Sequence, residues 1–132
     1  LKDAAKGMTG FMGYYILTAA ASCGGEKEVL DMVKEYYGGM LSLGATSFWE
    51  DFDVEWLKDN PQAVDEMPCD NRKNIHRDYG KFCYKQLRHS LCHGWSAVPV
   101  YYFHKFLPAY QYTVPELCLL LPDGKAYHTK SW

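Results

Sequence analysis

The sequence lacks long hydrophobic runs, an excess of charge of either sign, and any segment typical of a targeting signal. No apolar run approaches the roughly 18 residues of a membrane-spanning helix, so we expect no membrane partner. The formal net charge of −2 gives no electrostatic reason to expect nucleic acid as a partner. Leu1-Lys2-Asp3 does not open a signal peptide, since no charged leader precedes an apolar core, and the chain is expected to be a piece of something longer.

A regular cysteine pattern and a phosphate-binding glycine loop are also missing. The odd count of five cysteines argues against a disulfide scaffold and predicts buried free thiols, at Cys23, Cys69, Cys83, Cys92 and Cys118. Unpaired thiols favour a reducing compartment only weakly, so both cytoplasm and periplasm stay open as locations. No metal is expected, because Cys92 and His93 are adjacent and no paired Cys-x-x-Cys spacing occurs. No glycine-rich loop follows a strand, so we expect no nucleotide cofactor.

Apolar and aromatic residues are plentiful. With 132 residues, of which 48% are hydrophobic and 23% charged, the chain is large enough for one domain with a real core and too short for two. Aromatic residues reach 16%, and eleven of them are tyrosines, which suit wet clefts and interfaces because each offers an apolar ring and a polar tip.

Hydrophobic periodicity predicts a mainly α fold. Residues 9–21 are apolar on all sides, which predicts a helix buried in a larger assembly of helices. Residues 26–37 predict an amphipathic partner helix, which Gly38-Gly39 is expected to stop. The turn Cys23-Gly24-Gly25 joins the two helices into an αα-hairpin, and several hairpins would be needed to cover the inner helix. Glycines spaced three apart form a strip for close backbone approach, at Gly7, Gly10 and Gly13.

The middle of the chain divides into blocks of opposite charge. Residues 50–70 carry eight of the sixteen acids against one base, whereas residues 71–90 carry six bases against one acid. We expect these blocks to fold against each other as a long connection over a rim, with short regular structure because of Pro61 and Pro68. Residues 76–91 are compatible with a helix, and a loop is the alternative.

The C-terminal part contains a third apolar segment and a tail. Residues 94–107 predict a helix that begins near Ser96, which is a reasonable cap, and that ends before Pro108. Residues 116–132, which contain a Pro-Asp-Gly turn, are typical of a short β-hairpin.

The strongest functional signal lies in residues 38–56. Aromatic residues alternate there with acids, at Phe48, Trp49, Glu50, Asp51, Phe52, Asp53, Glu55 and Trp56. Carboxylates among aromatic faces suit sugars, because apolar sugar faces stack on indoles while hydroxyls and a reacting water bond to carboxylates. The alternative is a solvated acidic loop whose aromatic side chains anchor it to the core.

A second functional signal lies in residues 88–96, which place His89, His93 and Trp95 at the N-terminal end of the third predicted helix. Free backbone N–H groups at a helix start can orient a polar ligand or a nearby carboxylate. The alternative is that local backbone groups satisfy both histidines.

Together, the segments YYGGMLSLGATSFWEDFDVEW and RHSLCHGWSAVPVYYF resemble the catalytic domain of α-L-rhamnosidases, bacterial glycoside hydrolases with a six-hairpin (α/α) barrel. The resemblance runs from about Met8 to Leu107. It implies that Glu50 is the general base of an inverting hydrolysis and that His93 contacts the sugar. Trp49 and Trp95 would face the sugar or shape the site, and Asp53 and Trp56 would belong to the same substrate-binding surface. For Glu50 the alternative is a rim carboxylate paired with Arg72 or Arg77.

The resemblance also has limits that set expectations. No acidic motif matches the family's general acid, and beyond Leu107 the chain does not continue like the family. We therefore expect residues 1–110 to form the C-terminal part of a catalytic barrel and residues 111–132 a separate tail. The complete enzyme would hydrolyse terminal α-L-rhamnosides of oligosaccharides or glycosides without a cofactor, and the isolated chain would be inactive. Two alternatives are a non-catalytic helical module that binds carbohydrate or protein through Trp49, Trp56 and Trp95, and self-association through exposed apolar helices.

Overall fold

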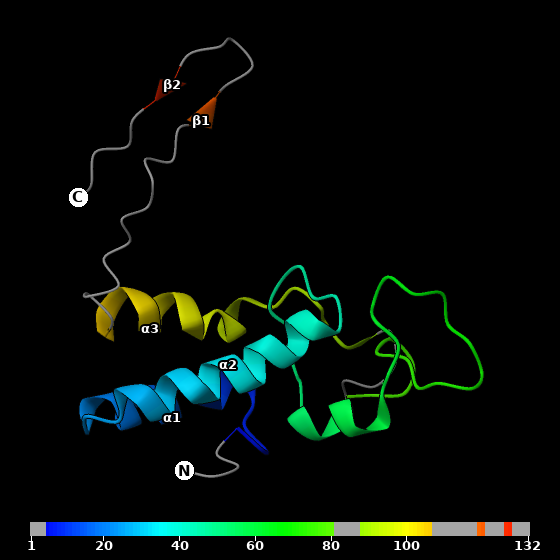
Figure 1. The fold of residues 1–132 in the computed structure, drawn as a ribbon, viewed down its shortest axis with the longest axis horizontal. Helices are drawn as coiled ribbons and strands as arrows, with labels where there is room; N and C mark the ends of the chain where they lie inside the picture. The colour runs from blue at the N-terminus through cyan, green and yellow to red at the C-terminus, as the bar shows by residue number, and fades with distance from the viewer. Residues whose placement is uncertain (1–4, 81–87, 107–118, 121–125, 128–132) are drawn as a thin grey trace.

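The computed structural model describes residues 5–80, 88–106, 119–120 and 126–127. Within these ranges the fold is mainly helical, as predicted, with α1 (Gly10–Ser22), α2 (Glu26–Ser42), the 3₁₀ helices η1 (Val54–Asp59) and η3 (Gly94–Ser96), and α3 (Val98–Phe106). Helix α1 packs against both α2 and α3, and the three lie side by side (Figure 1). None of the described helices is long and apolar enough to cross a membrane.

Helices α1 and α2 form the predicted αα-hairpin. Thr9 caps the start of α1, since its side-chain oxygen accepts a hydrogen bond from the Met12 N–H at 3.2 Å. At the other end, Gly24 adopts the left-handed conformation with φ +80°. The N–H groups of Gly24 and Gly25 then donate to the carbonyls of Ala21 and Ala20, each at 3.0 Å. This is the Schellman pattern that glycine permits, so the predicted glycine cap is confirmed.

The predicted end of the second helix is wrong. Helix α2 passes through Gly38 and Gly39 and ends at Ser42. Two residues later, Gly44 adopts the left-handed conformation with φ +82°. Gly39 is needed for packing, because a Cβ atom there would lie 2.8 Å from the ring of the buried Phe52. Gly39 therefore lets a loop approach the helix closely, and the glycine pair does not terminate the helix.

The two neighbouring glycines of α2 should respond oppositely to substitution by alanine. We expect Gly39→Ala to lower the free energy of unfolding by about 1–3 kcal/mol, because the added methyl overpacks against Phe52. Gly38→Ala meets nothing within 4 Å, and removing a helical glycine should raise stability by about 0.5–1 kcal/mol. Urea unfolding midpoints of the two variants give the comparison, and shifts in the same direction would contradict the packing.

Helix α1 is not buried on all sides as predicted. Gly10, Gly13, Leu17 and Ala21 face the core, and a Cβ at Gly10 would lie 2.8 Å from the Cβ of Ser96, so the predicted close approach is confirmed there. The opposite face is open, with exposed fractions of 38–53% for Phe11, Met12, Tyr14, Tyr15 and Ile16. Trp95 contacts Phe11 and Tyr101 contacts Tyr14 on this face, but these contacts leave much of it open to solvent.

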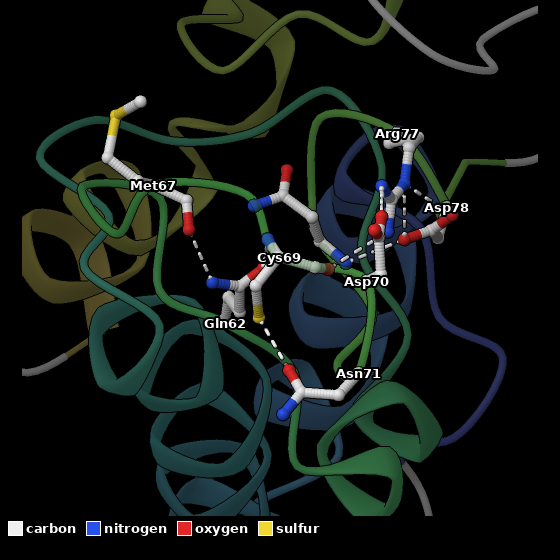
Figure 2. A network of polar contacts seen from close by, with 8 residues as sticks. Gln62, Met67, Cys69, Asp70, Asn71, Arg77 and Asp78 are labelled. Carbon is white, nitrogen blue, oxygen red and sulfur yellow. Dashed lines mark hydrogen bonds and ion pairs between the residues drawn. The ribbon is translucent and has the colours of Figure 1, made fainter.

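The oppositely charged blocks fold against each other, as predicted. Lys73 pairs with Asp59 at 2.7 Å and Arg72 with Glu66 at 2.9 Å. The only regular structure between Glu50 and Asp70 is the short η1. Figure 2 shows the Gln62 amide donating to the Met67 carbonyl at 2.7 Å, together with the contacts of Arg77 with Asp70 and Asp78. Residues 76–78 form a turn and residues 79–80 have no regular structure, so the helical interpretation fails there, and residues 81–87 lie outside the described ranges.

The described cysteines are not buried. Cys23 and Cys92 are exposed free thiols and Cys69 is half-buried, so the expected burial is wrong for the described cysteines; Cys83 and Cys118 lie outside the described residues.

In the tail, β1 (Leu119–Leu120) pairs antiparallel with β2 (Ala126–Tyr127). The remainder of the predicted hairpin falls outside the described ranges.

Candidate functional site

The two segments that carry the functional signals lie side by side. The Glu50 N–H donates to the Ser90 carbonyl at 2.8 Å, and the His93 N–H donates to the Phe48 carbonyl at 2.8 Å. These two backbone bonds join residues that are 40 and 45 positions apart in the sequence. The pairing brings the predicted base and the predicted sugar-contacting histidine into one site.

The Glu50 carboxylate occupies a defined position in this site. Its Oε2 accepts a hydrogen bond from the Ser90 N–H at 3.1 Å, and its Oε1 lies 3.9 Å from His93 Nδ1. The side chain is only 8% exposed, so it is screened from bulk water. The alternative of a rim carboxylate paired with arginine is wrong within the described structure, because Arg72 pairs with Glu66 and Arg77 with Asp78.

Trp95 supplies an aromatic surface next to His93. The two ring centroids lie 4.3 Å apart with an interplanar angle of 47°. The indole is 46% exposed, so part of its face is open to solvent. An imidazole beside a half-exposed indole is a surface on which a sugar ring could stack.

Trp49 does not face solvent. It is 1% exposed, and its ring makes edge contacts with the buried Phe52 and His89. The prediction that this indole faces the sugar is therefore wrong, and the alternative role, shaping the site, remains. The Trp49 carbonyl accepts a hydrogen bond from the buried Ser96 hydroxyl at 2.5 Å, which fixes the loop next to Glu50 on η3. Ser96 is thus a buried tether rather than the predicted helix cap.

Asp53 and Trp56 have structural roles in the chain as described. The Asp53 carboxylate accepts from the Glu55 N–H at 3.0 Å and caps η1. One face of Trp56 is stacked on Tyr79, with centroids 4.8 Å apart and an interplanar angle of 29°. No described ring contact or hydrogen bond joins Trp56 to Glu50, His93 or Trp95, so the substrate-binding role expected for it has no support from its position.

His89 follows the structural alternative. It is buried, and its Nε2 lies 2.7 Å from the Asp51 carbonyl oxygen and 3.2 Å from the Asp51 nitrogen. The shorter distance fits an Nε2–H that donates to the carbonyl. Burial lowers the pKa of His89, although its contact with Asp51 acts in the opposite direction, so the neutral ring is favoured. His89 thereby ties the loop after Glu50 to the segment before Ser90.

Sequence reasoning missed Ser90 and the burial of Asp51. Ser90 matters through its backbone N–H, which no side-chain pattern could reveal. Asp51 is 5% exposed and lies in the core, so it offers no carboxylate to a substrate beside Glu50. The described residues contain no group of histidine, cysteine or acidic side chains arranged to hold a metal ion.

Comparisons with protein-family models, with curated proteins and with solved structures return no match.

Proposed function

We propose that this chain carries the water-activating part of a glycoside hydrolase of the α-L-rhamnosidase type, with Glu50 as the general base. The observation that supports the proposal best is the pairing of residues 48–50 with residues 90–93. It places the Glu50 carboxylate 3.9 Å from the His93 imidazole, with the half-exposed Trp95 indole next to that imidazole. A base, a polar ring and a stacking surface are the groups that an inverting glycosidase needs on the water side of a sugar.

The proposed reaction uses the two oxygens of Glu50 differently. The Ser90 N–H holds Oε2, and Oε1 accepts the proton of a water molecule beside His93. That water attacks the anomeric carbon from the face opposite the leaving group, so one carbon–oxygen bond forms while the glycosidic bond breaks. The bond electrons depart with the leaving-group oxygen, which takes a proton from a general acid. His93 donates a hydrogen bond to a sugar hydroxyl and so orients the ring.

The general acid is proposed to come from outside these 132 residues. The sequence contains no acidic motif like the one that supplies the acid in the family it resembles. Asp51, the acid next to Glu50, is buried in the core. The isolated chain should therefore fail on leaving groups that need protonation, because an unprotonated alkoxide leaves very slowly.

A substrate that needs no acid tests this proposal directly. We expect the purified chain to hydrolyse α-L-rhamnosyl fluoride above the spontaneous rate, since fluoride leaves without a full proton transfer. Methyl α-L-rhamnoside, with the same sugar and a poor leaving group, should remain intact. A fluoride electrode measures the first reaction, and an assay for released sugar measures the second. Hydrolysis of both substrates would contradict the absence of the acid, and hydrolysis of neither with retained rhamnose binding would favour the non-catalytic binding module.

A further inference from the structure

The Glu50 side chain is held between two segments that have no regular structure of their own. Residues 48–53 and 89–93 contain neither helix nor strand, so no regular series of backbone bonds fixes their geometry. The Glu50 N–H donates to the Ser90 carbonyl at 2.8 Å. Among the described residues, the donor that holds the Glu50 carboxylate is the Ser90 N–H, at 3.1 Å. The direction of the carboxylate therefore depends on how firmly Ser90 is placed.

His89 provides a side-chain link between these two segments. Its Nε2 lies 2.7 Å from the carbonyl oxygen of Asp51, which directly follows the proposed base. The ring is 7% exposed and makes edge contacts with the indoles of Trp49 and Trp56, at centroid distances of 6.4 and 6.1 Å. Because two indoles and a carbonyl hold this ring, the peptide that follows it in the chain is held as well.

The second ring nitrogen of His89 makes this link sensitive to protons. Nδ1 is buried and has no hydrogen-bond partner among the described residues. In the neutral ring the proton is on Nε2, where it bonds to Asp51, and Nδ1 carries none. A second proton on Nδ1 would create a buried cation whose new N–H has no acceptor within the described structure. Burying an unpaired charge costs far more free energy than burying an unpaired neutral group.

The charged and titratable groups around His89 act in both directions. Burial has the largest effect and lowers the pKa of His89 below its ordinary value of 6.5, and His76 acts in the same direction. Asp51 and Glu50 act in the opposite direction, because acids favour a charged imidazole. The unfolded chain binds this proton more readily than the folded chain. The link therefore contributes stability that is present above about pH 6.5 and is lost as the pH falls through the pKa of the folded state.

We propose that His89 is a positioning residue for Glu50, and that a proton on its buried Nδ1 releases the carboxylate from its position. The proposal rests on the proposed function for the role of Glu50 as a base. While His89 is neutral, the Ser90 N–H holds Oε2 and leaves Oε1 facing His93. When the ring is charged, it moves out of the core toward water, and the Ser90 N–H loses its alignment with Oε2. Hydrolysis is thereby confined to the pH range in which His89 is neutral.

Amide hydrogen exchange of the full chain between about pH 5 and 8 tests the link without a substrate. The imidazole NMR signals give the pKa of His89, and the protection of the Glu50 and Ser90 N–H groups reports their mutual bonds. We expect this protection to fall about ten-fold as His89 gains its proton, while the amides of α2 keep theirs. Protection that does not follow the His89 titration overturns the proposal, and so does a simultaneous loss in α2, which would show global unfolding.

His89→Gln is the conservative variant for the same measurement. Its side-chain amide N–H can still donate to the Asp51 carbonyl, but it binds no proton in this pH range. We expect the protection of the Ser90 N–H to stay constant in this variant. Protection that still falls at acid pH would assign the effect to another group and overturn the role of His89. The measurement on the original chain decides the question if the variant does not fold.

Hydrolysis of α-L-rhamnosyl fluoride separates this proposal from the proposed function. His89→Leu keeps apolar bulk but removes the donor, so kcat should fall about 10-fold or more at unchanged KM, because a misplacement of about 1 Å can cost about 100-fold. His89→Gln should restore most of kcat and keep it to lower pH. His104→Leu, which changes an exposed histidine on α3, should alter neither.

The combined outcomes distinguish the two failures. An active original chain whose kcat is unchanged by His89→Leu overturns the positioning role and leaves the proposed function standing. Protection that follows the His89 titration in a chain without any fluoride hydrolysis supports the proton-sensitive link and overturns the proposed function.

Discussion

Glu50→Gln is expected to lower the hydrolysis of α-L-rhamnosyl fluoride by about 100-fold or more, because a positioned general base typically contributes that much. The amide keeps the shape of the side chain and can still accept the Ser90 N–H bond of 3.1 Å. It cannot take a proton from water. Steady-state fluoride release measures kcat/KM, and a lost turnover with unchanged rhamnose binding assigns the effect to chemistry.

Glu55→Gln is the matched control for this substitution. Glu55 is an acid in the same segment, but it lies on the surface and pairs with Lys58 at 2.7 Å. We expect this variant to hydrolyse the fluoride as the original chain does. Equal losses in both variants would assign the effect to the general charge of the segment, and an unaffected Glu50→Gln variant would remove Glu50 from the mechanism.

Trp49→Ala is expected to lower the free energy of unfolding by about 3–5 kcal/mol, as for other fully buried tryptophans. The indole is 1% exposed and packs on Phe52, with centroids 5.9 Å apart. Its removal leaves a cavity beneath the loop that holds Glu50. Denaturant unfolding, monitored by circular dichroism, gives the midpoint concentration and the slope of the unfolding free energy against denaturant.

Trp95→Ala is the corresponding control for stability. The same side chain is removed, but the indole is 46% exposed and lies at the edge of the core. A loss of less than about 1.5 kcal/mol is expected, since most of the cavity would be open to water. Equal losses for the two tryptophans would contradict the different burial that the structure gives them.

Local chain chemistry predicted much of the fold. Gly24 was predictable as a helix cap because only glycine adopts its φ of +80° without strain. Pairing of Lys73 with Asp59 followed from the adjacent blocks of opposite charge. Gly39 was misread because the same residue type both ends helices and permits close packing. Only the position of Phe52, which lies thirteen residues later, distinguishes the two roles.

The candidate site was predictable only in part. Glu50 and His93 come together because their segments pair through backbone bonds; the resemblance implied that both residues belong to one site, but it did not predict these bonds. The contrasting burial of Trp49 and Trp95 was not predictable, because it depends on which side of each loop meets the core. His89 and His93 lie only four residues apart in the sequence, yet Asp51 binds one of them in the core and Glu50 faces the other.

The most direct test of the central claim is azide rescue of a Glu50→Gly variant with α-L-rhamnosyl fluoride. Azide attacks without losing a proton, so it needs no base and can occupy the space that the carboxylate leaves. Glu50 as the water-activating base predicts that azide restores fluoride release and that the product is β-L-rhamnosyl azide, identified by NMR. No rescue, or the α-azide as product, would contradict it.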